Sequence, residues 1–451
     1  MLIAVFIERV GVYLKIVSNF RQNYIVFLIN SCGAVTALVY TYIVYSQQQG
    51  QYIGLNQFLS LEIILVAVWL TAYSISKPFD NIALLLFWAV IFRVIGIWGE
   101  PLLEDDWYRY LWDGYRFVVD GTPYGVSPAE YFAADLPGNF SEILGQINNP
   151  ELPTIYGPTL QYLFALAYLI SPGELWGLKL IMLVVDLSLI VILLKFASVS
   201  MVLLYAWCPL VIKEIAFTAH PDGIGVFLLM AALVLRWYKH VALAVIVAAM
   251  AVAAKVFAVL VVPWVLWRLS IKYWFMFALV LLVLYAPFVL QGSSDFFSLF
   301  EMARRWEFNP VVFGVLNTVL SDTTTKLVLG SLFIMWLVWY FFRSQAQSQQ
   351  FSLPRADWVY GLFLFISPVI NAWYWLWVLP FAVLFPSFWA WTASVALFLS
   401  YVVGLHIPGS ELAPYEMPLV VRLIEFSLIA AALIFDYKNR KISRREIDQN
   451  C

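Results

Sequence analysis

The stretch EDDWYRYLWDG, residues 104–114, places three consecutive carboxylates directly before a run of aromatic residues. It belongs to a hydrophilic segment, 99–155, that separates the apolar runs 81–98 and 156–171. A bilayer core is crossed by about 20 apolar residues in a helix, and shorter pieces also occur. The flanking runs are therefore predicted membrane spans, and 99–155 is predicted to be a loop at one membrane surface. Carboxylates in such a loop can accept a proton, hold a cation or bind a sugar.

The composition of the whole chain agrees with this interpretation. Of its 451 residues 63% are hydrophobic and only 12% are charged, and the mean hydropathy is +0.84. Soluble domains contain about 25% charged residues, so an all-α polytopic integral membrane protein is predicted. The net charge is −2 and no basic patch is present, which excludes a nucleic-acid partner. The three cysteines, Cys32, Cys208 and Cys451, match neither a disulfide framework nor a metal-ligand spacing.

The apolar runs predict about 12–14 transmembrane helices in a single domain that covers residues 1–451. One run, 241–267, contains Lys255 and is predicted to form either one tilted helix or two half-helices, because broken helices are tolerated where protein shields them. A short apolar piece, 310–320, suggests a re-entrant segment. The predicted spans are 24–45, 58–75, 81–98, 156–171, 178–195, 199–212, 222–238, 241–267, 273–290, 326–342, 357–369, 371–385, 388–405 and 419–435.

Basic residues predict the orientation, because short cytoplasmic loops are rich in lysine and arginine. The tail 436–451 contains five basic residues and is predicted to be cytoplasmic. The loop 99–155 has ten acidic residues, two arginines and no lysine, so it is predicted to be the first large non-cytoplasmic loop. Three spans precede it, which places the N-terminus in the cytoplasm. No removable signal peptide is predicted, and the first residues suggest an amphipathic helix lying on the membrane.

Residues from Asp105 onward are predicted to form an interfacial helix whose apolar side faces the membrane. Its charged residues recur at three- and four-residue spacing, which puts them on one face. Two ion pairs are expected within that face, Arg109–Asp113 and Arg116–Asp120, each worth a few tenths of a kcal/mol. Gly121-Thr122-Pro123-Tyr124 is predicted to end the helix.

Asp105 and Asp106 are the candidate catalytic residues. Carboxylates at the start of a helix also cap its amides and complement its dipole. A cap needs one carboxylate, however, whereas three in a row, including Glu104, repel one another and shift each other's pKa. Such a shift suits a general base.

Ionisable residues within membrane spans are costly and are candidates for function. Arg93 is expected either to pair with Glu100 or Glu104 of the nearby loop or to bind an anion. Asp186 is expected to bond to a neighbouring helix. The set comprises Glu62, Arg93, Asp186, Lys213, Glu214, Asp222 and Lys255.

Four of these residues can be interpreted further. Lys213 and Glu214 are adjacent and are expected to pair with each other. His220 and Asp222 can act as a metal ligand pair, as a proton-carrying histidine with its orienting carboxylate, or as a satisfied structural histidine. Lys255 stands alone in an apolar run, as a buried counter-ion would.

Two loop segments provide the remaining candidates. Arg304 and Arg305 lie in a predicted outward loop, where positive charge suits an anionic ligand such as phosphate, or a plain lipid headgroup. The segment 148–158 is proline-rich and contains two asparagines and Tyr156. It is expected to be either a rigid re-entry loop or a substrate contact.

The order of these motifs resembles the GT-C class of membrane glycosyltransferases, particularly polyprenyl-phosphate-mannose-dependent mannosyltransferases. The likeness covers most of the chain, and its individual motifs are loose. The usual Asp-x-Asp is replaced by adjacent aspartates, and three spans rather than one precede it. The matching residues are Asp105-Asp106-x-Tyr108, Asp113, Gly121, Pro123-Tyr124, Tyr156-x-Pro158, His220-x-Asp222, Lys255, Trp306-x-Phe308-Asn309 and Trp373-Tyr374-x-x-Trp377-x-x-Pro380.

The resemblance implies transfer of a hexose, mannose above all, from a polyprenyl-phosphate donor to a lipid or glycan acceptor. Asp105 or Asp106 would be the base of an inverting reaction on the non-cytoplasmic face. No cofactor is required, although a divalent cation is possible, and a bacterial inner (cell) membrane is the expected location. The expected substrate-binding residues are Arg93, Tyr108, Tyr156, His220, Asp222, Lys255, Arg304 and Arg305.

Two other functions compete with this one. A transporter or lipid flippase would use intramembrane charges such as Glu62, Asp186 and Lys255 for coupling, although transporters often have repeated halves and none is visible here. A non-catalytic scaffold would tolerate loss of both Asp105 and Asp106.

Overall fold

The computed structural model describes residues 2–51, 53–77, 80–345, 351–403 and 416–449, with side chains between 22 and 439 except at residue 55. Its described part contains helices and no strand. Five helices are long and apolar enough to cross a membrane, or six if the bent pair Val199–Ala206 and Pro209–Phe217 forms one span. The predicted class, an all-α polytopic membrane protein, agrees with this architecture. The number of 12–14 spans stays a prediction, because the five further apolar helices have only 10–17 residues.

Every predicted span contains helix. The N-terminal half comprises α1 (Leu2–Gln48), α2 (Leu55–Ser76), α3 (Ile82–Trp98), α4 (Asp106–Asp120), η1 (Pro128–Tyr131), α5 (Phe140–Gly145), α6 (Pro158–Ile170), α7 (Trp176–Leu193), α8 (Val199–Ala206), α9 (Pro209–Val211), η2 (Ile212–Phe217) and α10 (Asp222–Trp237). The C-terminal half comprises α11 (Val241–Ala254), η3 (Val256–Leu260), α12 (Val262–Leu266), α13 (Ile271–Val289), α14 (Phe296–Arg305), α15 (Val312–Leu316), α16 (Asp322–Gln345), α17 (Ala356–Ile366), η4 (Ala372–Trp377), α18 (Leu379–Leu384), α19 (Phe388–Ala396), η5 (Leu397–Val403) and α20 (Leu419–Gln449).

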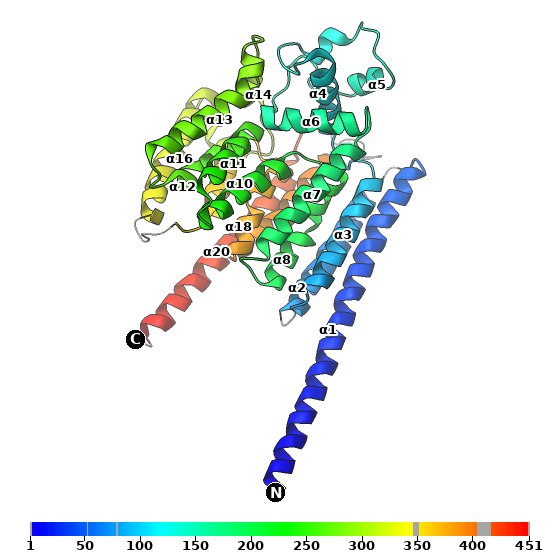
Figure 1. Ribbon diagram of the computed structural model, residues 1–451, viewed down its shortest axis with the longest axis vertical. Coiled ribbons are helices and arrows are strands. Elements are labelled where there is room, and N and C mark those ends of the chain that lie inside the picture. The colour runs from blue at the N-terminus through cyan, green and yellow to red at the C-terminus, as the bar shows by residue number, and fades with distance from the viewer. Residues whose placement is uncertain (1, 52, 78–79, 346–350, 404–415, 450–451) are drawn as a thin grey trace.

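The helices form one bundle with the acidic loop at one end. In Figure 1, α4, α5 and α14 lie at the top, whereas the N-terminal part of α1 and the C-terminal part of α20 project from the lower side. Residues 2–48 form one continuous helix, α1, and the side chains before residue 22 lie outside the described part. The same holds for the side chains of the predicted cytoplasmic tail from residue 440 onward.

Helix α4 confirms that the loop contains a helix, but this helix is more deeply buried in the protein than an interfacial helix would be. It begins at Asp106 and ends at Asp120, where Gly121 follows with φ +77°, a conformation that suits glycine. Residues 109–116 are all buried, so protein encloses most of the polar face, whereas Asp120 at its end is 37% exposed. The close packing against α6 depends on Gly114, because a Cβ there would lie 2.4 Å from the carbonyl oxygen of Phe164.

The charged residues of α4 make one of the two expected ion pairs. Arg116 pairs with Asp120 as predicted. The pair Arg109–Asp113 was predicted wrongly, because Arg109 donates to carbonyl oxygens of the loop, including that of Leu152 at 2.9 Å. Asp113 instead accepts hydrogen bonds from Thr154 and from Gln161, in agreement with its expected structural role. Arg109 and Asp113 therefore fix the loop 148–156 against α4.

The run 241–267 is broken at Lys255, which confirms two short helical pieces rather than one tilted helix. Helix α11 ends at Ala254, Lys255 is extended with φ −141° and ψ 127°, and helical turns resume at Val256. Gly157 packs against this break, since a Cβ there would lie 2.2 Å from the carbonyl oxygen of Ala253. This contact brings Tyr156 and Lys255 together.

Arg93 has a different partner from either predicted one. Its Nε lies 2.5 Å from Oδ2 of Asp186 on α7, and the Arg93 side chain is 1% exposed. Tyr205 donates a further hydrogen bond of 2.7 Å to Asp186. Arg93 therefore joins α3 to α7 inside the bundle, and the expected pairing with Glu100 or Glu104 is wrong. Asp186 bonds to a neighbouring helix, as expected.

Candidate functional site

One cavity collects residues from seven separate parts of the chain. It lies beside the start of α4, and five of the ten predicted site residues line it: Asp105, Asp106, Tyr156, His220 and Lys255. The other lining residues come from the loop, from 302–308, from η4 and from η5. They are Leu103, Glu104, Arg109, Asn148, Asn149, Leu152, Pro153, Ile155, Met302, Trp306, Phe308, Asn371, Ala372, Trp373, Tyr374, Ser400, Tyr401 and Val403.

The two candidate bases share one hydrogen-bond donor. The side-chain amide of Asn148 donates to Oδ1 of Asp105 and to Oδ1 of Asp106, each at 2.8 Å. Asp105 occupies the position before α4, yet its side chain makes no capping hydrogen bond. The carboxylate of Asp105 is thus positioned by Asn148 rather than used as a helix cap.

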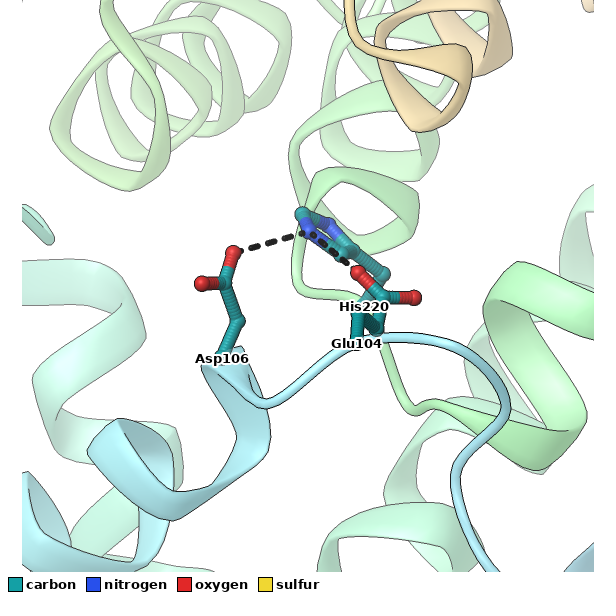
Figure 2. A group of neighbouring side chains, drawn as sticks. All are labelled: Glu104, Asp106 and His220. Carbon is teal, nitrogen blue, oxygen red and sulfur yellow. Dashed lines mark ion pairs between the residues drawn. The ribbon is translucent and has the colours of Figure 1, made fainter. Parts of the chain in front are cut away.

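His220 lies among three carboxylates. Its Nε2 is 3.6 Å from Oδ2 of Asp106 and 4.0 Å from Oε2 of Glu104, and its Nδ1 is 3.0 Å from Oδ2 of Asp222. Figure 2 shows the carboxylates of Glu104 and Asp106, from the loop and the start of α4, both directed at the imidazole. The ring of Trp373 stacks on the imidazole at a centroid distance of 4.7 Å. The histidine is 1% exposed, so its orientation is fixed.

Asp222 links His220 to Lys255. The Nζ of Lys255 lies 3.1 Å from Oδ2 of Asp222. The other oxygen, Oδ1, accepts a hydrogen bond of 2.7 Å from the indole of Trp377. The Lys255 ammonium also lies 5.0 Å from the ring centroid of Tyr156, within cation–π range. Asp222 therefore supports two cationic side chains at the cavity wall, whereas its own carboxylate is fully buried.

Glu104 has a lysine partner that the spacing in the sequence does not reveal. The Nζ of Lys213 lies 2.6 Å from Oε1 of Glu104 and 3.2 Å from Oε1 of Glu214. The expected Lys213–Glu214 pair is thus confirmed, and Glu104 adds to it. Tyr401 donates to Glu214. Lys213 and Glu214 lie in η2, a π-helical turn of the kind that is frequent at functional sites.

The pKa values of these groups are displaced in opposite directions. Burial and the neighbouring Asp106 raise the pKa of Asp105 to about 7. Burial also acts to raise the pKa of Asp106, but His220, Asn148 and Lys255 outweigh it and the pKa falls below its ordinary value. Although burial acts to lower the pKa of His220, the surrounding carboxylates raise it to about 9. At neutral pH the site thus holds an imidazolium, a carboxylate at Asp106, and Asp105 near its titration point.

Glu104, Asp106 and His220 also have the number and type of ligand atoms that a divalent cation needs. One atom of each lies within 4.8 Å of the others. A metal-bound histidine must be neutral, however, and Lys213 already lies 2.6 Å from Glu104. Lys213 and His220 instead pair with the carboxylates of Glu104 and Asp106. These side chains therefore suit an ion-pair network better than a metal site.

Five predicted substrate-binding residues lie outside the cavity lining. One of them, Asp222, is fully buried behind His220 and Lys255, as described above. Arg93 is buried against Asp186, as described above. Tyr108 stacks on Trp107 at a centroid distance of 3.7 Å and faces a second cavity. Arg304 and Arg305 end helix α14, where both pair with Glu301 at 2.9 and 2.7 Å. Their side chains are 53% and 65% exposed, so they do not extend the charge of the cavity.

Comparison of the chain with known protein families, with characterised proteins and with solved structures gives no significant match. Any assignment of function therefore rests on the residues of this chain. The sequence did not predict that Asn148 donates to Asp105 and Asp106, or that Glu104 pairs with Lys213. Both residues nevertheless lie in segments that the sequence singled out, 148–158 and 104–114. Tyr401 was also missed, because its position in an apolar run gave no signal of a contact with Glu214.

Proposed function

We propose that the protein is a GT-C-type membrane glycosyltransferase. It transfers a hexose, mannose in this proposal, from a polyprenyl-phosphate donor to a hydroxyl group of a lipid or glycan acceptor. The supporting observation is that one cavity contains a candidate base, Asp105, together with two cationic groups, His220 and Lys255. Sugar transfer from a lipid phosphate requires these two functions side by side.

In the proposed reaction the acceptor oxygen attacks the anomeric carbon from the face opposite the phosphate. The new bond joins that oxygen to the anomeric carbon, and the bond from the anomeric carbon to the phosphate oxygen breaks with its electron pair. The acceptor proton passes to Asp105, whose pKa of about 7 makes it the stronger base of the two aspartates. Asp106 remains a carboxylate beside His220. The product has the inverted configuration.

The leaving polyprenyl phosphate gains negative charge as the bond breaks. Lys255 and the His220 imidazolium stabilise this charge, and Asp222 keeps both in place at 3.1 and 3.0 Å. Fixed positive groups in a site shielded from water are effective because they need no reorganisation during the reaction. A lipid-linked donor needs no nucleotide-binding motif.

The apolar helices place this chemistry at a membrane. In the proposal the loop 99–155 faces the non-cytoplasmic side, both termini are cytoplasmic, and the membrane is a bacterial cell membrane. The elements α4 and α5 lie at the end of the bundle from which neither terminus projects (Figure 1). Donor lipid and polar acceptor can therefore meet at one membrane–water boundary.

The proposal is tested by incubating purified protein in detergent with a labelled polyprenyl-phosphate mannose and an alkyl mannoside acceptor. Formation of a labelled disaccharide that depends on Asp105 supports it. If the wild-type protein neither transfers nor hydrolyses any lipid-linked sugar, the proposal is wrong. Uptake of the intact labelled lipid across vesicles would then favour a transporter or flippase.

The rate of transfer is expected to follow a bell-shaped pH profile. Asp105 must be deprotonated to act as base, so kcat/KM rises as the pH increases through about 7. His220 must stay protonated, so kcat/KM falls above about pH 9. The measurement is initial rates between pH 5 and 10, with the range chosen around these two values. In His220→Gln the acidic limb should remain and the alkaline limb should disappear; an unchanged profile in this variant would contradict the role of the imidazolium.

Replacing Lys255 with methionine is expected to lower kcat by about 10²–10³-fold, the typical cost of removing one group that stabilises charge in the transition state. Lys255→Arg should retain more activity, because it keeps the positive charge. Lys272→Met, which removes an exposed lysine on α13, is the control and should not change the rate. Equal rates for Lys255→Met and the control would exclude the assigned role. Thermal unfolding of each variant separates this effect from loss of structure.

A further inference from the structure

A second cavity lies beside the start of α4, lined by other side chains of the same segment. Its walls come from the loop after α3, from the first turn of α4, from α5 and from the start of α7. The lining residues are Ile97, Gly99, Glu100, Pro101, Trp107, Tyr108, Asn139, Glu142, Ile143, Gly173, Glu174, Leu175, Trp176 and Lys179. None of the residues assigned to proton transfer or phosphate stabilisation is among them.

The chemistry of this second cavity differs from that of the first. Trp107 and Tyr108 present stacked aromatic rings, with centroids 3.7 Å apart. Three carboxylates, those of Glu100, Glu142 and Glu174, are exposed at the cavity.

Lys179 is the single cation among the described residues that line the second cavity, and its side chain is 3% exposed. It donates to the carbonyl oxygens of Gly96, at 3.0 Å, and of Gly99. The Lys179 ammonium group is thus hydrogen-bonded to the backbone. Because three carboxylates and one ammonium group line the cavity, its net charge is negative.

We infer that the second cavity binds the neutral saccharide portion of the acceptor, an inference that rests on the proposed function. Aromatic rings can pack against the C–H faces of a sugar, and carboxylates accept hydrogen bonds from its hydroxyl groups. The excess of negative charge opposes a phosphorylated or carboxylated ligand. The first cavity, with Lys255 and His220, suits the anionic donor instead. We therefore assign the anionic donor to the first cavity and the neutral acceptor to the second.

The path of the chain supports this division. The segment 99–108 lines both cavities: Asp105 and Asp106 face the first, and Trp107 and Tyr108 face the second. Trp107, which would hold the acceptor, is thus two residues along the chain from the candidate base, Asp105. Because Asp105 and Trp107 line different cavities, we assign one sugar of the acceptor to the second cavity and the reacting hydroxyl, on a second sugar, to the first.

The binding test uses the neutral probe octyl α-mannobioside and the variant Glu142→Gln/Glu174→Gln. Asp135→Asn/Glu151→Gln is the matched control, because it removes two exposed carboxylates of the loop 99–155 that line neither cavity. Binding is measured by saturation-transfer NMR in an Asp105→Asn background and without donor, so that no turnover occurs. The cavity variant should bind about tenfold more weakly, and the control should bind like the parent. Equal affinity in the two double variants would overturn the inference, as would tighter binding of octyl glucuronide than of the neutral probe.

The kinetic test separates the inference from the proposed function. With Asp105 present, the cavity variant should raise KM for octyl α-mannobioside about tenfold and leave hydrolysis of the labelled donor, measured without acceptor, unchanged. A KM equal to that of the wild type, with transfer intact, would refute the acceptor site alone. Absence of both transfer and donor hydrolysis in the wild type would refute the proposed function, and the binding measurement would then still decide whether the cavity takes a saccharide.

Discussion

Asp105→Asn is expected to lower kcat for sugar transfer by about 10²–10⁴-fold, the range that a positioned general base contributes. Asparagine has nearly the same shape and still offers an oxygen to the amide of Asn148, which donates to Asp105 at 2.8 Å. It cannot accept the proton of the acceptor hydroxyl. KM for the donor should change little, because the donor phosphate is assigned to Lys255 and His220. The measurement is initial rates of labelled-sugar transfer at saturating acceptor.

The neighbouring variant Asp106→Asn distinguishes the two aspartates. Asp106 is paired with His220 at 3.6 Å, so its loss should act through the imidazolium by lowering the pKa of His220. Both limbs of the pH profile should then move to lower pH, because the Asp106 carboxylate also raises the pKa of Asp105, whereas Asp105→Asn should remove the acidic limb. Asp135→Asn, an exposed aspartate of the same loop, is the control. Wild-type rates in both Asp105→Asn and Asp106→Asn would eliminate the general-base assignment.

Asp186→Ala is expected to reduce the free energy of unfolding by about 3–5 kcal/mol, because it leaves the charge of Arg93 buried without a partner. The Arg93 side chain is 1% exposed and its Nε is 2.5 Å from Asp186. Two backbone carbonyls, those of Ala89 and Ala206, accept from Nη1 and would remain. They do not neutralise the charge. Unfolding of the purified variants in mixed detergent micelles measures the difference.

The double variant Arg93→Met/Asp186→Leu tests whether the unpaired charge of Arg93 causes the loss of stability in Asp186→Ala. Replacing a buried ion pair with apolar residues of similar volume is often neutral or stabilising. The double variant should therefore recover most of the stability that Asp186→Ala loses. Equal destabilisation in the single and double variants would show that packing, rather than an unpaired charge, is responsible.

Local features of the fold were predictable from the sequence because they depend on neighbours in the chain. The helix from Asp106 to Asp120 follows from its residue spacing, and Gly121 ends it in a left-handed conformation. The break at Lys255 follows from a charged residue in a run too long for one short helix. Both features position the site. The helix was expected at the residues where the structure has it, whereas the sequence left open whether the run 241–267 forms one tilted helix or two half-helices.

Partners far apart in the sequence were not predictable in the same way. Helical spacing identifies residues on one face but does not say which other helix that face meets. Arg93 lies 93 positions from Asp186, and Lys213 lies 109 positions from Glu104. Arg109 was expected to pair within its helix because a carboxylate lay four residues away. The loop 148–156 instead supplies carbonyl oxygens to Arg109, a contact that only the folded loop creates.

For Arg304 and Arg305 of α14, the sequence did indicate the ion pairs that the structure shows. Glu301 precedes Arg304 and Arg305 by three and four residues, the spacing at which oppositely charged side chains meet on a helix. The structure has these pairs at 2.9 and 2.7 Å. Considering helical spacing there would have favoured a solvated ion-pair cluster over a phosphate site.

The most direct test of the proposed function is the product formed by the wild-type protein from polyprenyl-phosphate mannose labelled at the anomeric carbon. NMR of the labelled product reports both transfer and anomeric configuration in one measurement. The proposal predicts a glycosidic bond to the acceptor with configuration opposite to that of the donor, because attack and departure occur on opposite faces of the sugar. A product with the donor's configuration would contradict the single-displacement mechanism, and recovery of the unaltered donor with every acceptor would contradict sugar transfer itself.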